Sequence, residues 1–345
     1  MLGGGVFVTQ NKVLPGSYIN VINASNGNVT LGERGTVAIA LPLNHKPGEV
    51  IISDKSMFLH ESETVFGAKY NSTELVALRE IFCHATKVLV YDLGEDKTVA
   101  DACAAFEPYD FNVLCVYTDT VEDVATYIAQ VKTWRDEMGK KCQLVVHNYT
   151  TPNYEGVINV VSTVSDESAP EYALLAWVAG AEAGCAINKS CTNMKYDGEY
   201  TIVTGRTQYQ LEQCLKGGQF VFHNVYGDVC VLEDINSLTT ITEDKGEDFR
   251  YNQTIRVIDQ VANDIAKMFN TKYLGKIPNN ASGRVTLWGD IVKHHKQLEE
   301  IQAIENFDSS LVTVEQGDTK KSVVVNDVIT VVNAMAQLYM TLRIQ

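Results

Sequence analysis

The sequence is short of positive charge and lacks the signals that mark secretion and membrane insertion. It carries 28 Lys and Arg against 43 Asp and Glu, a formal net charge of −15. This deficit argues against nucleic-acid binding and against attachment to anionic lipid, because both use a basic surface. No basic and apolar signal peptide opens the chain, and the Ala- and Gly-rich stretch 169–187 contains Glu171 and Glu182, which predicts a buried helix. We therefore expect cytoplasmic synthesis, with no nucleic-acid and no membrane partner.

Motifs for metal and phosphate binding are also missing. The eight cysteines include no Cys-x-x-Cys pair and lie mostly in apolar runs, which predicts reduced core residues instead of a zinc site. The glycines 3–5 precede a strand-like stretch, whereas a phosphate loop connects a strand to a helix. The acidic loop 92–96 could hold a cation, but a solvated turn is the simpler interpretation. We predict no cofactor-binding and no metal-binding residues.

Catalytic patterns are equally sparse. Gly-x-Ser-x-Gly is absent, and His84, His147 and His223 stand singly beside predicted strands or helices, as structural histidines do. His294 and His295 are adjacent on a predicted helix, where neighbouring side chains point about 100° apart. We expect this pair to be exposed to solvent and unable to chelate one metal. The sequence therefore predicts no catalytic residues and no enzyme.

The middle of the chain alternates apolar runs with amphipathic stretches. Apolar runs at 88–91, 113–117, 144–146 and 157–161 alternate with helix-like segments at 98–106, 121–138 and 170–184. Continuous apolar strands between helices are typical of a mostly parallel sheet that is covered on both faces. The many Ala and Gly residues of 170–184 favour close packing of that helix on the sheet.

The flanking regions have shorter elements. Strand-like stretches at 36–41 and 50–52, separated by turn formers, predict a small β-rich module before a helix at 75–83. Stretches at 200–203, 220–222 and 229–232 predict a second β-rich region. Beyond residue 241, the pattern predicts helices at 255–268 and 289–304, a hairpin of strands 311–314 and 323–325, and a short helix near 329–336.

Both ends of the chain have the pattern of edge strands. Leu338, Met340, Leu342 and Ile344 fall on one side of an extended chain, and the residues between them fall on the other. Residues 6–9 and 18–22 are also strand-like and follow the glycines 3–5. A strand with one apolar face needs a partner edge, which its own domain or a neighbouring copy can provide.

Several motifs, in this order, resemble the contractile tail sheath proteins of Gram-positive bacteriophages and phage-tail-like bacteriocins. The resemblance spans essentially the whole chain, although each motif alone is weak, and Cys185 and Cys191 are particular to this sequence. The motifs are Gly-Gly-Gly-Val-Phe-Val-Thr-Gln-Asn at 3–11, Glu-Arg-Gly at 33–35, Ala-Trp-Val-Ala-Gly at 176–180, Asn-Lys-Ser-Cys-Thr at 188–192, Asp-Ile-Asn-Ser-Leu at 234–238 and Arg-Val-Ile-Asp at 256–259.

The resemblance implies a multidomain α/β fold with extended strand arms at both termini. It implies an N-terminal arm (1–24), a small β-sandwich domain (25–86), a doubly wound, subtilisin-like α/β domain without the protease triad (87–241), a C-terminal α/β domain (242–336) and a C-terminal arm (337–345). The arms would insert into neighbouring copies. The implied inter-subunit residues are Val6, Phe7, Val8, Tyr18, Ile19, Val21, Leu338, Met340, Leu342 and Ile344.

The function that the resemblance implies is mechanical. Copies would form a helical sheath of stacked rings around a tail tube and contract from a metastable extended state to drive the tube through the target envelope. The implied partners are further copies, the tube protein, and the baseplate and tail terminator proteins, in a phage virion tail or a released bacteriocin particle. Two alternatives stay open at this point: a cytoplasmic α/β enzyme (a hydrolase or nucleotide-dependent protein) with ordinary edge strands, and a static shell.

Overall fold

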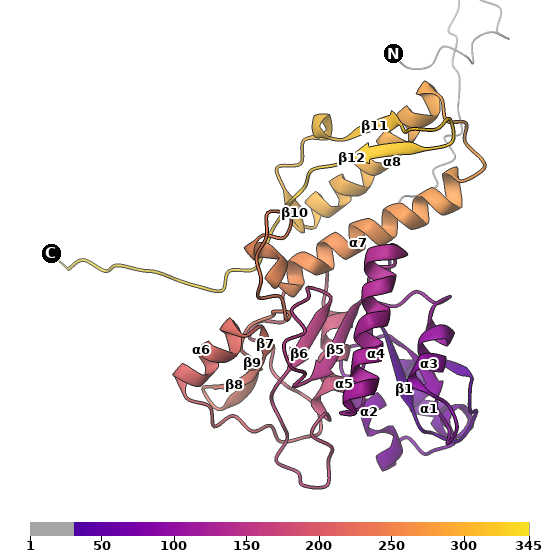
Figure 1. Ribbon diagram of the computed structural model, residues 1–345. Helices are drawn as coiled ribbons and strands as arrows, with labels where there is room; N and C mark the ends of the chain where they lie inside the picture. Colours follow the sequence, from indigo (N-terminus) through magenta and orange to yellow (C-terminus); the bar gives the residue numbers. More distant parts are fainter. Residues whose placement is uncertain (1–30, 345) are drawn as a thin grey trace, which may run out of the picture.

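A computed structural model, which describes residues 31–344, places one mixed β-sheet at the centre of the larger part of the molecule (Figure 1). Its seven strands lie in the order β2-β3-β1-β4-β5-β6-β7. β2 runs antiparallel to β3 at one edge, and every other neighbouring pair is parallel. The strands are β1 (Thr36–Leu41), β2 (Val50–Asp54), β3 (Lys87–Asp92), β4 (Val113–Cys115), β5 (Gln143–His147), β6 (Val157–Val160) and β7 (Gln219–Phe220).

Helices cover both faces of this sheet, as the continuous apolar strands predict. Side chains alternate along β1, so that Val37 and Ile39 pack in the core beneath α2 and α5, whereas Ala38 and Ala40 pack in the core beneath α3 and α4. The helices are α1 (Lys55–Phe66), α2 (Val76–Ile81), α3 (Val99–Phe106), α4 (Val121–Lys132), continued by a π-helical turn (Thr133–Glu137), and α5 (Leu174–Gly184). A 3-10 turn, Thr73–Leu75, precedes α2.

The close packing expected of α5 is confirmed by its glycines. A Cβ atom on Gly180 would lie 2.3 Å from the carbonyl oxygen of Ile81, and one on Gly184 would lie 2.2 Å from that of His84. Only a residue without a side chain allows this approach between α5 and α2. The two helices therefore pack backbone to backbone under the sheet.

The structure corrects the separate β-sandwich expected over 25–86. β1 and β2, the strands on which that expectation rests, belong to the seven-stranded sheet, and β1 lies between β3 and β4. The physical reason is burial on both faces, because residues 37–41 are all buried, as a central parallel strand requires. Helix α1, which begins at an Asp54 N-cap, was not expected from the sequence.

Beyond β6, smaller elements flank the last strand of the sheet. Residues 200–203, expected to be strand-like, form only an isolated bridge, Val164 to Ile202. An antiparallel hairpin follows β7, as the apolar stretches at 220–222 and 229–232 predict. These elements are α6 (Gln208–Lys216), β8 (Phe222–Val225) and β9 (Asp228–Val231).

A second, smaller part of the molecule is built on α7, which lies between the sheet and the remaining elements (Figure 1). A buried ion pair, Arg135 Nη1 to Asp259 Oδ2 at 2.5 Å, joins α7 to the turn after α4. The expected hairpin is confirmed as β11 paired with β12. The elements are a 3-10 turn (Glu247–Arg250), α7 (Asn252–Met268), a π-helical turn (Phe269–Tyr273), α8 (Ala281–Glu300), β10 (Ile304–Glu305), a 3-10 turn (Ser309–Leu311), β11 (Thr313–Gln316), β12 (Val323–Asn326) and β13 (Thr330–Val331).

The short helix expected near 329–336 is wrong. Residues Thr330–Val331 form β13, which pairs antiparallel with β10, and the chain stays extended beyond it. The pairing with β10 places the Val331 side chain in the core beside α7 and α8, which a helix would not do. Between residues 31 and 344, no helix combines the length and the apolar character needed to cross a bilayer.

Candidate functional site

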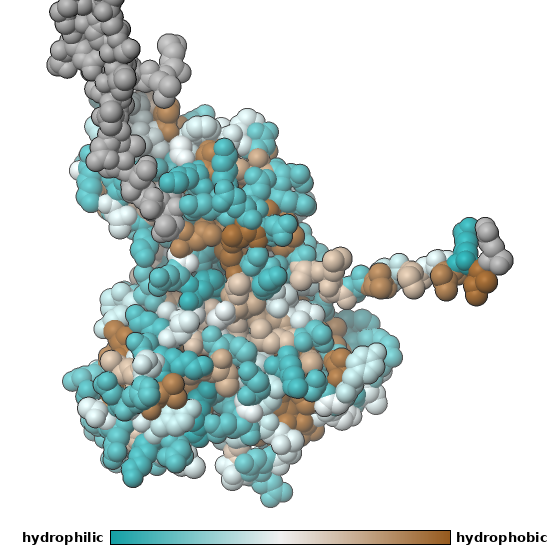
Figure 2. Space-filling model, turned by 180° about the vertical axis from the view of Figure 1, so that it is seen from behind, coloured by the Kyte–Doolittle hydropathy of each residue, from teal (hydrophilic) through white to brown (hydrophobic). Residues whose placement is uncertain are grey.

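The candidate assembly segment is the extended chain at 335–344, which leaves the body of the molecule after β13 (Figure 2). Leu338, Met340, Leu342 and Ile344 keep 86%, 77%, 78% and 91% of their surface exposed. Within the described residues this segment has no strand partner, so the predicted alternation exists without an edge to pair with. Four large apolar side chains in open solvent are a feature typical of interaction sites.

The root of the segment is fixed to the first turn of α7. The Gln253 side chain donates to the Val332 carbonyl at 3.0 Å and accepts from the Ala334 amide at 2.9 Å. The Thr254 hydroxyl and the Asn333 amide group bond to each other at 3.0–3.1 Å. These hydrogen bonds fix the chain to α7, and the last of them along the chain is at Ala334.

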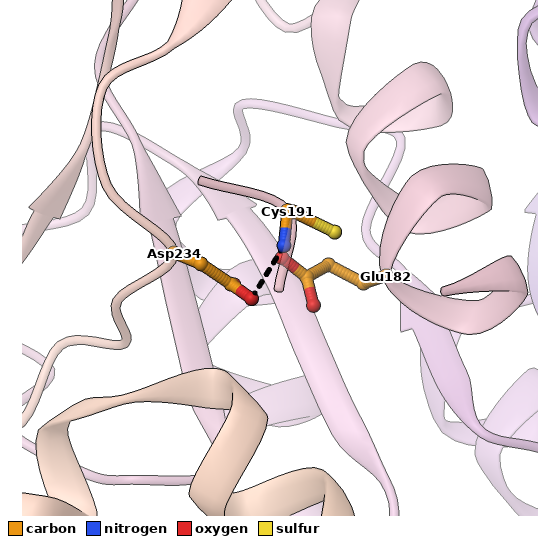
Figure 3. A group of neighbouring side chains, drawn as sticks. All are labelled: Glu182, Cys191 and Asp234. Carbon is orange, nitrogen blue, oxygen red and sulfur yellow. Dashed lines mark hydrogen bonds between the residues drawn. The ribbon is translucent and has the colours of Figure 1, made fainter. Parts of the chain in front are cut away.

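A buried charged cluster lies one turn further along the same helix, and Figure 3 shows three of its members, Glu182, Cys191 and Asp234. Arg256, from α7, has its Nη2 2.6 Å from Glu182 Oε2 of α5 and 3.4 Å from Asp234 Oδ2. The backbone N–H of Cys191 donates to Asp234 at 2.9 Å, and the Asn252 amide donates to the same carboxylate group at 2.9 Å. All three charged side chains are buried. The cluster ties α7 to the end of α5 and to two loops.

The two carboxyl groups of this cluster have opposite pKa shifts. Burial and the Asp234 carboxylate raise the pKa of Glu182 well above its usual range. Burial also opposes ionisation of Asp234, but Arg256, the Glu182 carboxyl group and the donors from Cys191 and Asn252 outweigh it and lower its pKa. Burial likewise opposes the charge of Arg256, yet both carboxyl groups raise its pKa well above the usual value. From these directions we expect Glu182 to carry a proton and Asp234 to be the counter-ion of Arg256, although Arg256 Nη2 lies closer to Glu182.

The same cluster brings together side chains that could ligate a metal ion. One potential ligand atom each from Glu182, Cys191 and Asp234 lies within 4.8 Å of the others. The Arg256 guanidinium occupies this position, with Nη2 3.9 Å from the Cys191 sulfur. A hydrogen bond to Cys185 and burial raise the pKa of Cys191 well above its usual value, so its thiol stays protonated and is a poor ligand. The donor set fits an arginine, not a metal ion.

Cys185, the hydrogen-bond partner of Cys191, has the more acidic thiol of the two. The hydrogen bond from the Cys191 thiol outweighs burial and lowers the pKa of Cys185 to about 7. Both thiols are free, as are the other six cysteines. The expectation of reduced core cysteines is met, since all but Cys83 are buried.

The acidic loop after β3 is a structural turn. Asp92 is buried, and its carboxylate accepts the backbone N–H groups of Asn44, His45, Lys46 and Gly94 at 2.6–3.0 Å. These bonds outweigh burial and lower the pKa of Asp92. The first residue of the loop therefore fixes the 44–46 turn beside β1 instead of holding a cation.

The expectation for His294 and His295 is wrong. Both side chains are fully buried on α8, one against Asp264 and the other against Asp327. The reason is that two different segments cover adjacent sides of α8, and the sequence of the helix alone does not show this. The available signal for the buried network on α7 was the motif at 256–259, which carries Arg256 and Asp259.

A possible acceptor for an added strand is the β11–β12 hairpin. It forms a two-stranded sheet, so within the described residues each strand has one edge without a strand partner. Val324 and Val325 of β12 are exposed, together with Leu311 just before β11. The predicted arm residues Val6, Phe7, Val8, Tyr18, Ile19 and Val21 lie outside the described residues.

Comparisons with known proteins agree on one family. Residues 95–237 match the family model described as phage tail sheath protein central domain, and residues 244–345 match the phage tail sheath C-terminal domain. A phage-like element PBSX protein, XkdK of Bacillus subtilis, is 30% identical over 257 residues, covering 71% of this chain and 55% of that protein. The tail sheath protein of Clostridium phage phiCD119 is 27% identical, covering 67% of this chain and 64% of that protein. The chain thus spans somewhat more than half the length of the curated relatives it matches.

Solved structures have the same fold. A sheath tail protein from Desulfitobacterium hafniense superposes with a TM-score of 0.78 at 26% identity, covering 92% of this chain and 96% of that one. The sheath tail protein from Listeria innocua gives 0.77 at 23% identity, covering 88% and 93%. The contracted helical sheath of the anti-feeding prophage gives 0.73 at 14% identity, covering 96% and 99%, and at that identity it shows the fold alone. The matched families and structures are structural sheath proteins, not enzymes.

Proposed function

The chain belongs to the phage tail sheath protein family, and we propose that it is the repeating subunit of a contractile sheath whose copies are joined by exchanged β-strands. Each copy lends its 338–344 segment to the β11–β12 hairpin of a neighbour. The N-terminal residues 6–8 and 18–21 form the second lent strand.

The observation that carries this proposal is the exposed apolar face of 338–344. Exposure of four large apolar side chains on one extended segment costs free energy unless a partner covers them. The root bonds at Gln253 and Thr254 hold residues 332–334 on α7, so the segment is anchored at one end only. Such an anchored strand reaches a second copy without detaching from its own.

We expect the free energy of strand addition to hold neighbouring copies together while the sheath contracts. Each backbone hydrogen bond contributes about 0.5–1.5 kcal/mol net. Four or five such bonds, together with burial of the apolar face, would contribute roughly 5–10 kcal/mol before ordering costs. The backbone ladder gives affinity, and pockets for alternate side chains give specificity. A two-stranded sheet is marginally stable alone, so the hairpin also gains from an added strand.

Exchanged strands allow the sheath to contract without separating its copies. Two structural neighbours, the helical sheath of the anti-feeding prophage and the sheath complex of an extracellular contractile injection system, are in the contracted state. For this chain we propose assembly in a metastable extended state around a tube protein, between baseplate and terminator proteins, in a virion tail or a released particle. The exchanged strands keep the copies joined while the globular bodies slide to contacts of lower free energy.

Paired substitutions on the two faces of the segment test strand exchange. Leu342→Asp places a charge on the apolar face, and Thr341→Asp places the same charge on the opposite face. We expect both purified variants to unfold at the wild-type temperature, because the segment does not contact its own body. Negative-stain electron microscopy should show sheaths for the wild type and Thr341→Asp only. Normal sheaths from Leu342→Asp would overturn the proposal.

A further inference from the structure

Two buried cysteines lie at the end of α5. Cys185 caps this helix, and its backbone N–H donates to the Ala181 carbonyl at 2.8 Å. Cys191 follows the loop 186–190, and its backbone N–H donates to Asp234 at 2.9 Å. Both thiols are free and belong to the same core. The loop between them therefore begins and ends at a buried thiol.

The two sulfur atoms are neighbours. Figure 3 shows the Cys191 sulfur on the α5 side of its backbone, away from Asp234. This sulfur lies within 4.8 Å of a Glu182 carboxyl oxygen. Cys185 follows Glu182 by three residues, a spacing that places two side chains on one face of a helix. The Cys191 thiol accordingly donates a hydrogen bond to the Cys185 sulfur.

The loop 186–190 joins the larger part of the molecule to α7 and α8. The Asn188 side chain donates to the Ile301 carbonyl, just after α8, at 2.7 Å. The Lys189 carbonyl accepts from Arg256 Nη1 of α7 at 2.6 Å. The Ile187 side chain is buried in a core that includes residues of α7 and α8. A bond between the two thiols would close a ring around this joint.

The Cys185 thiol lies just below the surface. Its side chain is buried, but its chain neighbours Gly184 and Ala186 are exposed. A cavity of about 190 Å³, with Arg34 and Ala186 among its lining residues, opens beside the loop. A small neutral oxidant such as hydrogen peroxide can therefore approach the pair, whereas a peptide disulfide is too large.

The surroundings of Cys185 favour its reactive form. The hydrogen bond from the Cys191 thiol, with Arg256 and Arg34 nearby, outweighs burial and lowers the pKa of Cys185 to about 7. Arg256 Nη2 also lies 3.9 Å from the Cys191 sulfur. The thiolate is the form of cysteine that attacks an oxidant. Cys185 is therefore the thiol that reacts first, and the protonated Cys191 thiol is the second.

We propose that Cys185 and Cys191 are an oxidation site, at which hydrogen peroxide forms a disulfide that closes the 186–190 loop. The Cys185 thiolate attacks one peroxide oxygen, the O–O bond breaks, and the hydroxide that leaves takes up a proton to become water. The resulting sulfenic acid of Cys185 is then attacked by the Cys191 sulfur. The S–O bond breaks as the S–S bond forms, and the hydroxyl group leaves as water with the Cys191 proton. Two thiols and one peroxide thus give one disulfide and two waters.

Peptide mapping of the folded, unassembled full chain tests this oxidation. The protein is treated with hydrogen peroxide, its remaining thiols are blocked with N-ethylmaleimide, and it is digested without reduction. Trypsin cuts between the two cysteines, after Lys189, so the disulfide should join peptide 142–189 to peptide 190–195. The linked pair should be the main product and should lose two hydrogen atoms relative to the separate peptides. Absence of this link, or a link from 190–195 to any other peptide, would overturn the proposal.

Two serine variants assign the link. Peptide 142–189 also contains Cys142, so Cys185→Ser should abolish the linked pair. Cys214→Ser removes another buried thiol, on α6, and should leave the linked pair at the wild-type level. A linked pair that persists in Cys185→Ser would contradict the assignment. The wild-type map stays decisive if either variant fails to fold.

Hydrogen exchange measures what the disulfide does to the joint. Peptides that cover 186–190 should exchange about tenfold more slowly in the oxidised wild type than in the reduced protein, because a closed ring restricts local opening. Equal exchange in both forms would show that the bond does not fix the joint. A role in particles released into an oxidising medium rests on the proposed function, but these measurements use unassembled protein. Their failure leaves sheath assembly intact, and failure of Leu342→Asp to block assembly leaves the oxidation site intact.

Discussion

At the scale of single residues, buried charge is what organises the contact between the sheet and α7. Arg256 lies between two carboxyl groups, of which we expect Asp234 to be ionised and Glu182 to hold a proton. Removing one partner of a buried ion pair leaves an uncompensated charge and costs about 3–5 kcal/mol. We therefore expect the two carboxyl groups to contribute unequally to the free energy of unfolding, although both lie near the same guanidinium.

Neutral isosteres at these two positions test that inequality. Asp234→Asn should lower the free energy of unfolding by about 3 kcal/mol, because Arg256 loses its counter-ion. Glu182→Gln should keep or raise the free energy of unfolding at neutral pH, because its amide is uncharged in both states, whereas the folded wild type must hold a proton that the unfolded chain has released. Urea unfolding of both variants measures the difference. Equal losses would show that Glu182 is ionised.

The pH dependence of the same pair has a defined sign. The pKa of Glu182 is raised in the folded state, so the folded protein binds this proton more tightly than the unfolded chain. Stability from this group is present below the unfolded pKa of about 4.3 and falls as the pH rises towards the folded value. Compared with Glu182→Gln, the wild type should lose stability over that rise. A constant difference between the two proteins would contradict the raised pKa.

Little of this residue-scale detail could be predicted from the sequence. Arg256 was expected only within a motif, and His294 and His295 were expected in solvent. Burial of a polar helix position depends on which distant segments cover it, and here those segments are α7 and the chain before β13. The apolar strand positions were predictable because their pattern is local.

At the scale of elements, the packing of α5 against α2 depends on residues without side chains. Gly180 and Gly184 let the two backbones approach, which places Trp177 and its neighbours in the core under β1. Helix α8 also contains a glycine, Gly289, but no atom lies within 4 Å of the position its Cβ would take. Helices α5 and α8 therefore provide two glycines for comparison: Gly180 lies in a tight backbone contact and Gly289 faces open space.

Alanine at these two glycines should have effects of opposite sign. Gly180→Ala brings a methyl group to 2.3 Å from a backbone oxygen, and we expect a loss of about 1–3 kcal/mol as the helices separate. Gly289→Ala removes only the helix penalty of glycine and should gain about 0.5–1 kcal/mol. Thermal unfolding of both proteins measures this. A neutral Gly180→Ala would show that α5 can move away from α2 without cost.

Element type was more predictable than element pairing. Continuous apolar runs give parallel strands and small residues give close helix packing, and both expectations hold for β3–β6 and α5. The 36–41 run was assigned to a separate module because partner choice in a parallel sheet is non-local. The helix near 329–336 failed for the same reason, since β10 offers β13 an edge that its own sequence does not show.

At the scale of the whole molecule, the described chain is a folded body with one exposed strand that has no partner within it. Under the proposed function, each copy lends this segment to a neighbour and receives one at a hairpin edge, which links the copies into a polymer. The resemblance noted in the sequence implies this exchange, which stays a prediction. Composition and periodicity alone do not imply it, because an ordinary edge strand has the same alternation.

Deleting residues 338–345 should separate folding from assembly. We expect a folded monomer with an unchanged unfolding temperature, since root bonds end at Ala334, and no sheaths. Analytical ultracentrifugation and electron microscopy measure both properties. A truncated protein that builds normal sheaths would show that contacts between bodies are sufficient.

The most direct test of exchanged strands is a cryo-electron microscopy reconstruction of sheaths assembled from the wild-type protein. Density for 338–344 should form a strand beside β11 or β12 of a neighbouring copy. The side chains of Leu338, Met340, Leu342 and Ile344 should face the core of that copy. The account is contradicted if the segment pairs with its own body, or if neighbouring copies touch only through their globular parts.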